Sequence, residues 1–454
     1  MSTAVAESGA ALRPSGLEPL QEDAGPQALL ATLAARSLAG GGWALGTLAV
    51  GLGLGVARTL VVARLLGARE MGVMGMALLT VGTVEAFTAT GLESALVSQP
   101  GDIRDDLDSA FAISVLRGVL ITALLWAAAP LVAAAFGTAE AAPVIRVVAL
   151  TALLRSLSNP ALPLLVKRIA FRRVFWWSLP GAVTGFALAV GVARVRPDVW
   201  ALVAGAVGAQ VVATAASYAM LPHRPGLRVR REGVRRLLHY GKWVSGARAL
   251  AWLSLSADNA VVGRFLGASA LGVYQVAFRV GELAVVTLTY AVVQVALPAL
   301  AQLRASGQLA RGFRAALGVV LAANCAFAAG VLLWGGPLLG RLLGPAWLPA
   351  VPVLRILVVA MVFRAAAATA GGLFEAVRRP SITARVNAVR LAVMLVTIFP
   401  LMHRFGMEGV AGSVLLASAA AAALALHRAR ALLQHADGTG GAGGLPAGSS
   451  LAPG

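Results

Sequence analysis

Long apolar blocks separated by short charged segments are the feature that most constrains how this chain can fold. Residues 119–135 carry no charged side chain, and residues 313–340 carry one. Of the 454 residues, 59% are hydrophobic and 13% are charged, whereas soluble domains are about half apolar and about a quarter charged. A helix of about 20 apolar residues crosses a bilayer core. Because lipid offers no hydrogen-bond partners, the backbone groups of such a segment must bond to one another within the helix. We therefore predict an all-α integral membrane protein.

The apolar blocks predict about twelve transmembrane helices. We place them at residues 39–63, 71–98, 108–135, 142–166, 174–194, 198–220, 241–263, 271–300, 312–339, 351–376, 383–403 and 407–427. The same pattern divides the chain into a cytosolic tail (1–37), a six-span N-lobe (38–221), a basic cytosolic linker (222–240), a six-span C-lobe (241–430) and a disordered cytosolic tail (431–454).

Basic side chains between the blocks predict the orientation. With both termini in the cytosol, the inside segments hold 22 Lys and Arg residues and the outside segments hold seven, as the positive-inside rule requires. We therefore expect a multi-pass protein of the cytoplasmic membrane. The net charge of +19 is then explained by topology and anionic lipid headgroups, and nucleic acid is not expected as a partner. The basic linker either lies on the headgroups or forms a docking site for a partner enzyme.

Two phrases recur in the same order in both halves. Residues 64–73 read RLLGAREMGV and residues 264–273 read RFLGASALGV, at a spacing of 200. The segment PVIR at 143–146, followed by Arg155, matches PVLR at 352–355, followed by Arg364, at a spacing of 209. Since each half has six spans, both halves run in the same sense, and transporters built from parallel repeats bind their cargo between the halves.

These phrases resemble a known family. The pattern around Arg64, with GLESALV at 91–97, DNAVVGRFLGASALGVY at 258–274 and a span ending at Pro298, is similar to the polysaccharide and oligosaccharide (Wzx-like) flippases of the multidrug/oligosaccharidyl-lipid/polysaccharide exporter superfamily. The resemblance covers roughly residues 36–430. It implies a two-lobed, V-shaped exporter that flips undecaprenyl-diphosphate-linked glycans by alternating access, for cell-surface polysaccharide biosynthesis. The partners it implies are the lipid-linked glycan, membrane lipids and other polysaccharide-assembly proteins.

Charged residues deep in the spans are candidates for the binding site, because they persist in a membrane where they face a cavity or a partner. Four other arginines, including Arg390, lie near span ends and are expected to reach the interface. Guanidinium groups suit an anionic diphosphate because they offer paired donors and stay charged. Gln275, Arg279 and Glu282 stand at i, i+4 and i+7, and Arg155 and Asn159 at i and i+4, so each set is predicted to share one face of a helix. The cavity candidates are Arg58, Arg155, Asn159, Asp258, Gln275, Arg279, Glu282 and Arg364.

Three of these residues carry more specific hypotheses. An arginine at the spacing of Arg58 before the Arg64 phrase faces the central cavity in the lipid II flippases, which this region resembles. The spacing of 200 also relates Arg58 to Asp258, so we predict an ion pair between them that closes the cleft in one state. Arg279 has a local alternative, a salt bridge to Glu282 that needs no substrate.

Nothing in the sequence points to catalysis. There is no P-loop, the single cysteine excludes a disulfide within the chain, and none of the five histidines has metal-ligand spacing. We expect no enzyme activity, cofactor or metal. A lipid II flippase and a cation-coupled drug antiporter of the same superfamily remain alternatives, although deep arginines outnumber deep acids and disfavour cationic cargo. The sequence does not identify the glycan or the coupling ion.

Overall fold

The described part of the chain is helical throughout. The computed structural model describes residues 26–91, 104–167, 170–226, 249–285, 309–377 and 379–438, with Gly246, Thr289 and Val292, and no strand occurs among them. The first half contains α1 (Pro26–Leu65), α2 (Ala68–Phe87), α4 (Arg104–Ala135), α5 (Ala141–Ser156), α6 (Leu162–Lys167), α7 (Phe171–Val195) and α8 (Val199–Met220). The second half contains a helix over 249–261, η2 (Val262–Leu266), α10 (Gly267–Ala284), α12 (Leu309–Leu342), η4 (Pro345–Trp347), α13 (Ala350–Ala376) and α14 (Pro380–Gly438).

Each of the twelve predicted spans coincides, at least in part, with helix in the described residues. Eight helical stretches there are long and apolar enough to cross a membrane. Two of them, 249–283 and 381–434, each contain a glycine with a positive φ: Gly267 at 87° and Gly406 at 58°. Glycine tolerates this left-handed region, so each stretch folds back on itself and supplies two spans. The all-α membrane fold is confirmed.

Several boundaries differ from the expected ones. The fourth span is broken between α5 and α6, where Pro160 and Pro163 prevent a continuous helix. α1 already begins at Pro26, inside the expected N-terminal tail, and α14 continues to Gly438, inside the expected C-terminal tail. Most of the basic linker lies outside the described residues.

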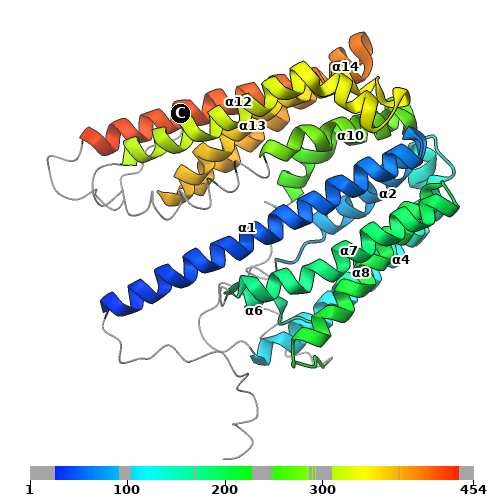
Figure 1. Ribbon diagram of the computed structural model, residues 1–454, viewed down its shortest axis with the longest axis horizontal. Coiled ribbons are helices and arrows are strands. Elements are labelled where there is room, and N and C mark those ends of the chain that lie inside the picture. The colour runs from blue at the N-terminus through cyan, green and yellow to red at the C-terminus, as the bar shows by residue number, and fades with distance from the viewer. Residues whose placement is uncertain are drawn as a thin grey trace, which may run out of the picture.

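The helices form two lobes that meet at one end and diverge toward the other (Figure 1). α1, α2, α4, α7 and α8 make up one lobe, and α12, α13 and α14 make up the other with α10 on its inner side. α2 and α10 pack against each other between the lobes. The lobes diverge toward the ends where α1 begins and α14 finishes, which gives the V shape that the resemblance implies.

Small residues allow the backbones of α2 and α10 to approach closely. A Cβ on Gly72 would collide with the carbonyl oxygen of Ala268, and a Cβ on Gly272 would collide with that of Ala68. These four residues are the A-x-x-x-G positions of the repeated phrase. Small residues at this spacing are a common way for membrane helices to pack. The duplicated sequence therefore forms a symmetric crossing between the lobes.

Polar contacts join the lobes at the end where they meet. Arg64 Nη1 donates hydrogen bonds to the carbonyl oxygens of Arg341 (3.0 Å) and Leu342 (2.8 Å) at the end of α12. The indole of Trp347 donates to the Ala63 carbonyl over 3.0 Å. The basic side chain of Arg64 thus caps carbonyl groups that helix α12 leaves free at its C-terminus.

The outer surfaces of both lobes are apolar. Leu131 on α4, Leu333 on α12 and Val396 on α14 each expose more than 60% of their surface. Exposed apolar surface on this scale is unusual for a soluble monomer and is what a lipid-facing surface requires.

Candidate functional site

Arg58 lies on α1 and reaches another helix of the N-lobe. Its Nη1 atom packs beside Gly185 of α7, 3.7 Å from where a Cβ of that residue would be. Among the described residues, Arg58 has no hydrogen-bond or ion-pair partner.

Arg279 belongs to the opposite lobe and lies within electrostatic range of Arg58. It extends from α10, and its side chain is 67% exposed. We call Arg58 and Arg279 the interlobe arginine pair. Two like charges brought together from separate lobes favour binding of an anion between them.

Glu282 lies next to this pair and contacts two guanidinium groups. Its Oε2 atom is 3.8 Å from Arg279 Nη1, and its Oε1 atom is 3.6 Å from Arg364 Nη2. The side chains of Glu282 and Arg364 are 20% and 19% exposed. The salt bridge expected between Arg279 and Glu282 is therefore present, but the carboxylate is shared with a second arginine on α13.

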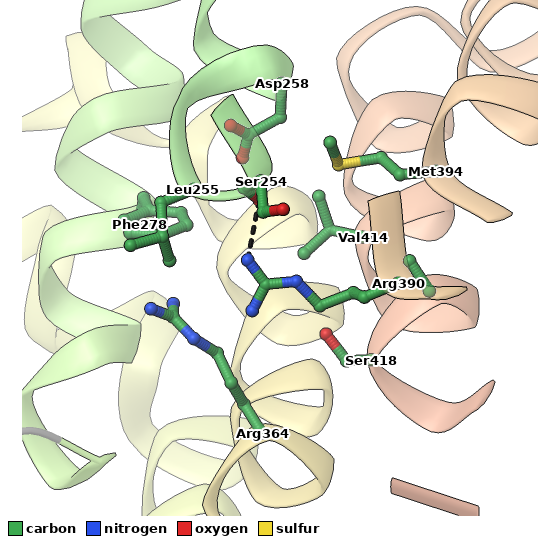
Figure 2. A pocket seen from close by; sticks show the side chains of 10 residues that line it. Ser254, Leu255, Asp258, Phe278, Arg364, Arg390, Met394, Val414 and Ser418 are labelled. Atoms are coloured by element: carbon green, nitrogen blue, oxygen red, sulfur yellow. Dashed lines mark hydrogen bonds between the residues drawn. The ribbon is translucent and has the colours of Figure 1, made fainter. Parts of the chain in front are cut away.

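A small pocket of about 20 Å³, lined by both apolar and charged side chains, lies inside the C-lobe beside Arg364 (Figure 2). The side chains of Arg364 and Arg390 approach each other across it, and Asp258 lies at its far side. Arg390 Nη2 donates to the Ser254 carbonyl over 2.7 Å. Arg390 thus points into the lobe instead of reaching the interface, because Ser254 and the pocket offer its guanidinium polar surroundings.

Asp258 is 2% exposed and has its own partners within the C-lobe. Its Oδ2 atom accepts a hydrogen bond from the Tyr274 hydroxyl over 2.8 Å, and Oδ1 accepts from the backbone and side chain of Asn259. The ion pair predicted between Asp258 and Arg58 is not formed in this structure. The offset of 200 residues identified equivalent positions, but the carboxylate faces the inside of its own lobe.

Arg155 pairs within the N-lobe. Its Nη1 atom lies 3.3 Å from Glu85 Oε2, which joins α5 to α2. The pair Arg364–Glu282 joins α13 to α10, and these are the equivalent helices of the second half. The repeat thus includes one internal ion pair per lobe, with the glutamate on the central helix in each case.

Asn159 is 1% exposed, and the structure places it in the packing of the break between α5 and α6. Its Nδ2 atom donates to the His223 carbonyl over 2.8 Å, its Oδ1 atom accepts from the Ala161 backbone, and its own backbone N–H donates to Ser217 Oγ. With these groups engaged and no exposure, Asn159 supports the chain turn in this structure instead of facing a ligand.

Gln275 lies at the crossing of the central helices. Its amide occupies the place where a Cβ on Gly75 of α2 would be. It shares one face of α10 with Arg279 and Glu282, so the face predicted from their spacing is present. Gln275 packs against the N-lobe, and Arg279 and Glu282 lie one and two turns further along α10.

The eight candidates therefore separate into three environments. Arg58, Arg279, Glu282 and Arg364 form a connected group that spans both lobes. Asp258 is inside the C-lobe, and Arg155, Asn159 and Gln275 each have partners elsewhere. No group of side chains suited to hold a metal ion occurs in the described ranges. The sequence did not identify Tyr274 as the partner of Asp258, because only the turn at Gly267 brings them together.

Comparison with known proteins agrees with this architecture. The sequence matches the family described as "Polysaccharide biosynthesis protein" over residues 61–352. It is 21% identical to the lipopolysaccharide biosynthesis protein WzxC of Escherichia coli (strain K12), over 79% of this chain and 74% of that protein. It is 26% identical to the succinoglycan biosynthesis transport protein ExoT of Rhizobium meliloti (strain 1021), over 70% of this chain and 64% of that protein.

Solved structures share the fold. An inward-facing multidrug resistance MATE family transporter of the MOP superfamily aligns over 85% of this chain and 95% of its own, with a TM-score of 0.69 and 17% identity. The lipid II flippase MurJ in an inward closed conformation aligns over 86% of this chain and 88% of its own, with a TM-score of 0.71 and 13% identity. Together with the family match over most of the sequence, the two-lobed helical architecture shows that this chain belongs to the Polysaccharide biosynthesis protein family, within the MOP superfamily fold.

Proposed function

We propose that this protein moves a lipid-linked oligosaccharide across the cytoplasmic membrane by alternating access, and that it binds the diphosphate of an undecaprenyl-diphosphate carrier between its lobes. The observation that carries the proposal is the interlobe arginine pair. Arg58 has no counter-charge among the described residues and faces Arg279 from the other lobe. A diphosphate bound there would neutralise both charges at once.

The chemistry of the group favours anionic cargo. Guanidinium groups hold phosphate oxygens through paired hydrogen bonds and keep their charge at any physiological pH. The proposed site holds Arg58, Arg279, Arg364 and Glu282, so three of its four residues are arginines and the one glutamate is already shared. A site for a cationic drug would need the opposite balance of charge. The family match and the relatives in polysaccharide biosynthesis support the same conclusion.

Transport in proteoliposomes tests the proposal. The purified protein is reconstituted and the movement of a fluorescent undecaprenyl-diphosphate oligosaccharide between leaflets is measured. We expect Arg58→Ala and Arg279→Ala each to reduce the rate about tenfold or more, because a hydrogen bond to a charged group contributes about 1.5–3 kcal/mol. The control is Arg194→Ala, an exposed arginine at the end of α7, which should transport normally.

Two outcomes would contradict the proposal. One is normal transport by both alanine variants at equal protein levels. The other is equal movement of an uncharged undecaprenol-linked glycan, which would show that the diphosphate is not recognised. Lipid II as a second cargo in the same assay separates the proposed function from that of a lipid II flippase.

A further inference from the structure

We propose that Glu282 is a built-in competitor for the anionic headgroup: its carboxylate holds Arg279 and Arg364 in the empty protein and must give them up when a diphosphate binds, so that it sets the affinity and allows release. This inference rests on the proposed function. It assigns to one acidic residue a role in setting how tightly the basic site binds.

The position of the carboxylate is the first argument. Each oxygen of Glu282 contacts a different guanidinium, Arg279 at 3.8 Å and Arg364 at 3.6 Å. A phosphate group offers the same arrangement, several anionic oxygens that can each face a separate arginine. The carboxylate oxygens of Glu282 therefore occupy positions beside the arginines that phosphate oxygens of a ligand would take.

The length of these contacts is the second argument. Charged hydrogen bonds between guanidinium and carboxylate groups are usually about 2.7–2.9 Å long, so both contacts of Glu282 are loose ion pairs. Among the described residues, the Arg364 side chain hydrogen bonds only to the thioether of Met361, over 3.6 Å, and thioether sulfur is a weak acceptor. Within that part of the chain neither arginine has a strong acceptor, so both can turn to a better one.

The surroundings of Arg364 are the third argument. Figure 2 shows its guanidinium at the edge of the C-lobe pocket, with Arg390 and Asp258 on the other sides. Arg364 thus lies beside charged groups of the C-lobe other than Glu282. In the N-lobe, Glu85 pairs with Arg155 over 3.3 Å, and Arg117 donates to the Glu85 carbonyl oxygen over 2.8 Å. We assign the competitor role to Glu282 because its two oxygens contact two arginines of the proposed binding site.

Binding measurements on the full-length protein in detergent test the inference. The probe is undecaprenyl diphosphate, with undecaprenol as the uncharged reference. Removal of the charge in Glu282→Gln should lower the Kd for the diphosphate about tenfold, since the arginines lose their internal counter-charge. Glu282→Asp keeps the charge and should bind within about threefold of wild type. The control is Glu375→Gln, an exposed glutamate of α13, which should match wild type.

A double variant covers the case in which Glu282→Gln does not fold because Arg364 loses its partner. The double variant Glu282→Gln with Arg364→Gln removes both charges of this ion pair and leaves Arg279 without a carboxylate beside it. It should bind the diphosphate more tightly than Arg364→Gln alone. If folded Glu282→Gln binds no more tightly than wild type, or the double variant no more tightly than Arg364→Gln, this inference fails while the proposed function stands. If wild type binds undecaprenyl diphosphate and undecaprenol equally, both fail.

Discussion

Charged side chains inside the spans differ most in how their charge is balanced. Arg155 and Arg364 each pair with a glutamate of the central helix in their own lobe. Asp258 is held by neutral hydrogen-bond donors. Arg58 has no such partner among the residues described. An uncompensated charge is expensive in a membrane, so the absence of a partner among these residues is what motivates the proposal that a ligand supplies the counter-charge of Arg58.

Asn159 illustrates the opposite situation, a polar residue whose bonds are all internal. Replacement by alanine would leave the Ala161 N–H without its partner in a buried turn and would remove one of the donors to the His223 carbonyl, which keeps a bond from Arg224. An unsatisfied buried group costs about 1–3 kcal/mol, so Asn159→Ala should lower the melting temperature of the purified protein by a few degrees. Its transport by the surviving folded fraction should remain normal.

The matched comparison is Arg155→Ala. Its ion pair to Glu85 involves an arginine side chain that is 61% exposed, and exposed pairs contribute about 0–1 kcal/mol. Its melting temperature should stay close to that of wild type. If Asn159→Ala melts at the wild-type temperature, the residue is not a support of the turn and its earlier prediction as a cavity residue regains weight.

Sequence spacing predicted which residues share a helix face better than it predicted which groups each side chain contacts. The positions of Gln275, Arg279 and Glu282 on one face of α10 follow directly from their spacing along a regular helix. For Asn159 the same reasoning was misleading, because α5 ends at Ser156 and no helical face continues to residue 159. Partners such as Tyr274 for Asp258 depend on a turn, and periodicity does not contain that information.

At the level of the helices, the crossing of α2 and α10 is the element most sensitive to side-chain size. A leucine at Gly272 would collide with the backbone of Ala68, and backbone cannot move aside as a side chain can. Overpacking of this kind costs about 1–3 kcal/mol, and about 1.4 kcal/mol shifts a two-state equilibrium tenfold. Gly272→Leu should therefore populate conformations in which the lobes separate at this end.

Distances between spin labels measure this shift. Labels at Arg196→Cys in the N-lobe and Leu348→Cys in the C-lobe, in a Cys325→Ala background, report on the end where the lobes meet. Gly272→Leu should add a longer distance to the distribution. Gly318→Leu is the control, because a Cβ there has no neighbour within 4 Å. An unchanged distribution in both variants would show that this crossing does not hold the lobes together.

The repeated phrases made the two-lobed architecture of the whole molecule predictable from the sequence. Two phrases at nearly constant spacing predicted two parallel halves, and the structure places the first phrase of each half in mutual contact at Gly72 and Gly272. The sequence did not predict that the loop phrase would form the interface itself. The A-x-x-x-G spacing was visible, but only the folded arrangement shows which helix each small residue meets.

Orientation in the membrane follows from combining this interface with the charge bias. The end closed by Arg64 and Trp347 carries fewer basic residues than the other end, so the positive-inside rule predicts that it lies outside. We therefore propose that the structure is inward-facing. Labelling with a membrane-impermeant maleimide in intact cells tests this, again without Cys325. Leu348→Cys, next to Trp347 at the closed end, should react, and Gln434→Cys near the end of α14 should react only after lysis. The reverse pattern would invert the protein, and the diphosphate site would then be open to the outside in this conformation. Since lipid-linked glycans are expected to enter from the cytosol, that result would also remove the structural basis for an exporter that loads its cargo in the state seen here.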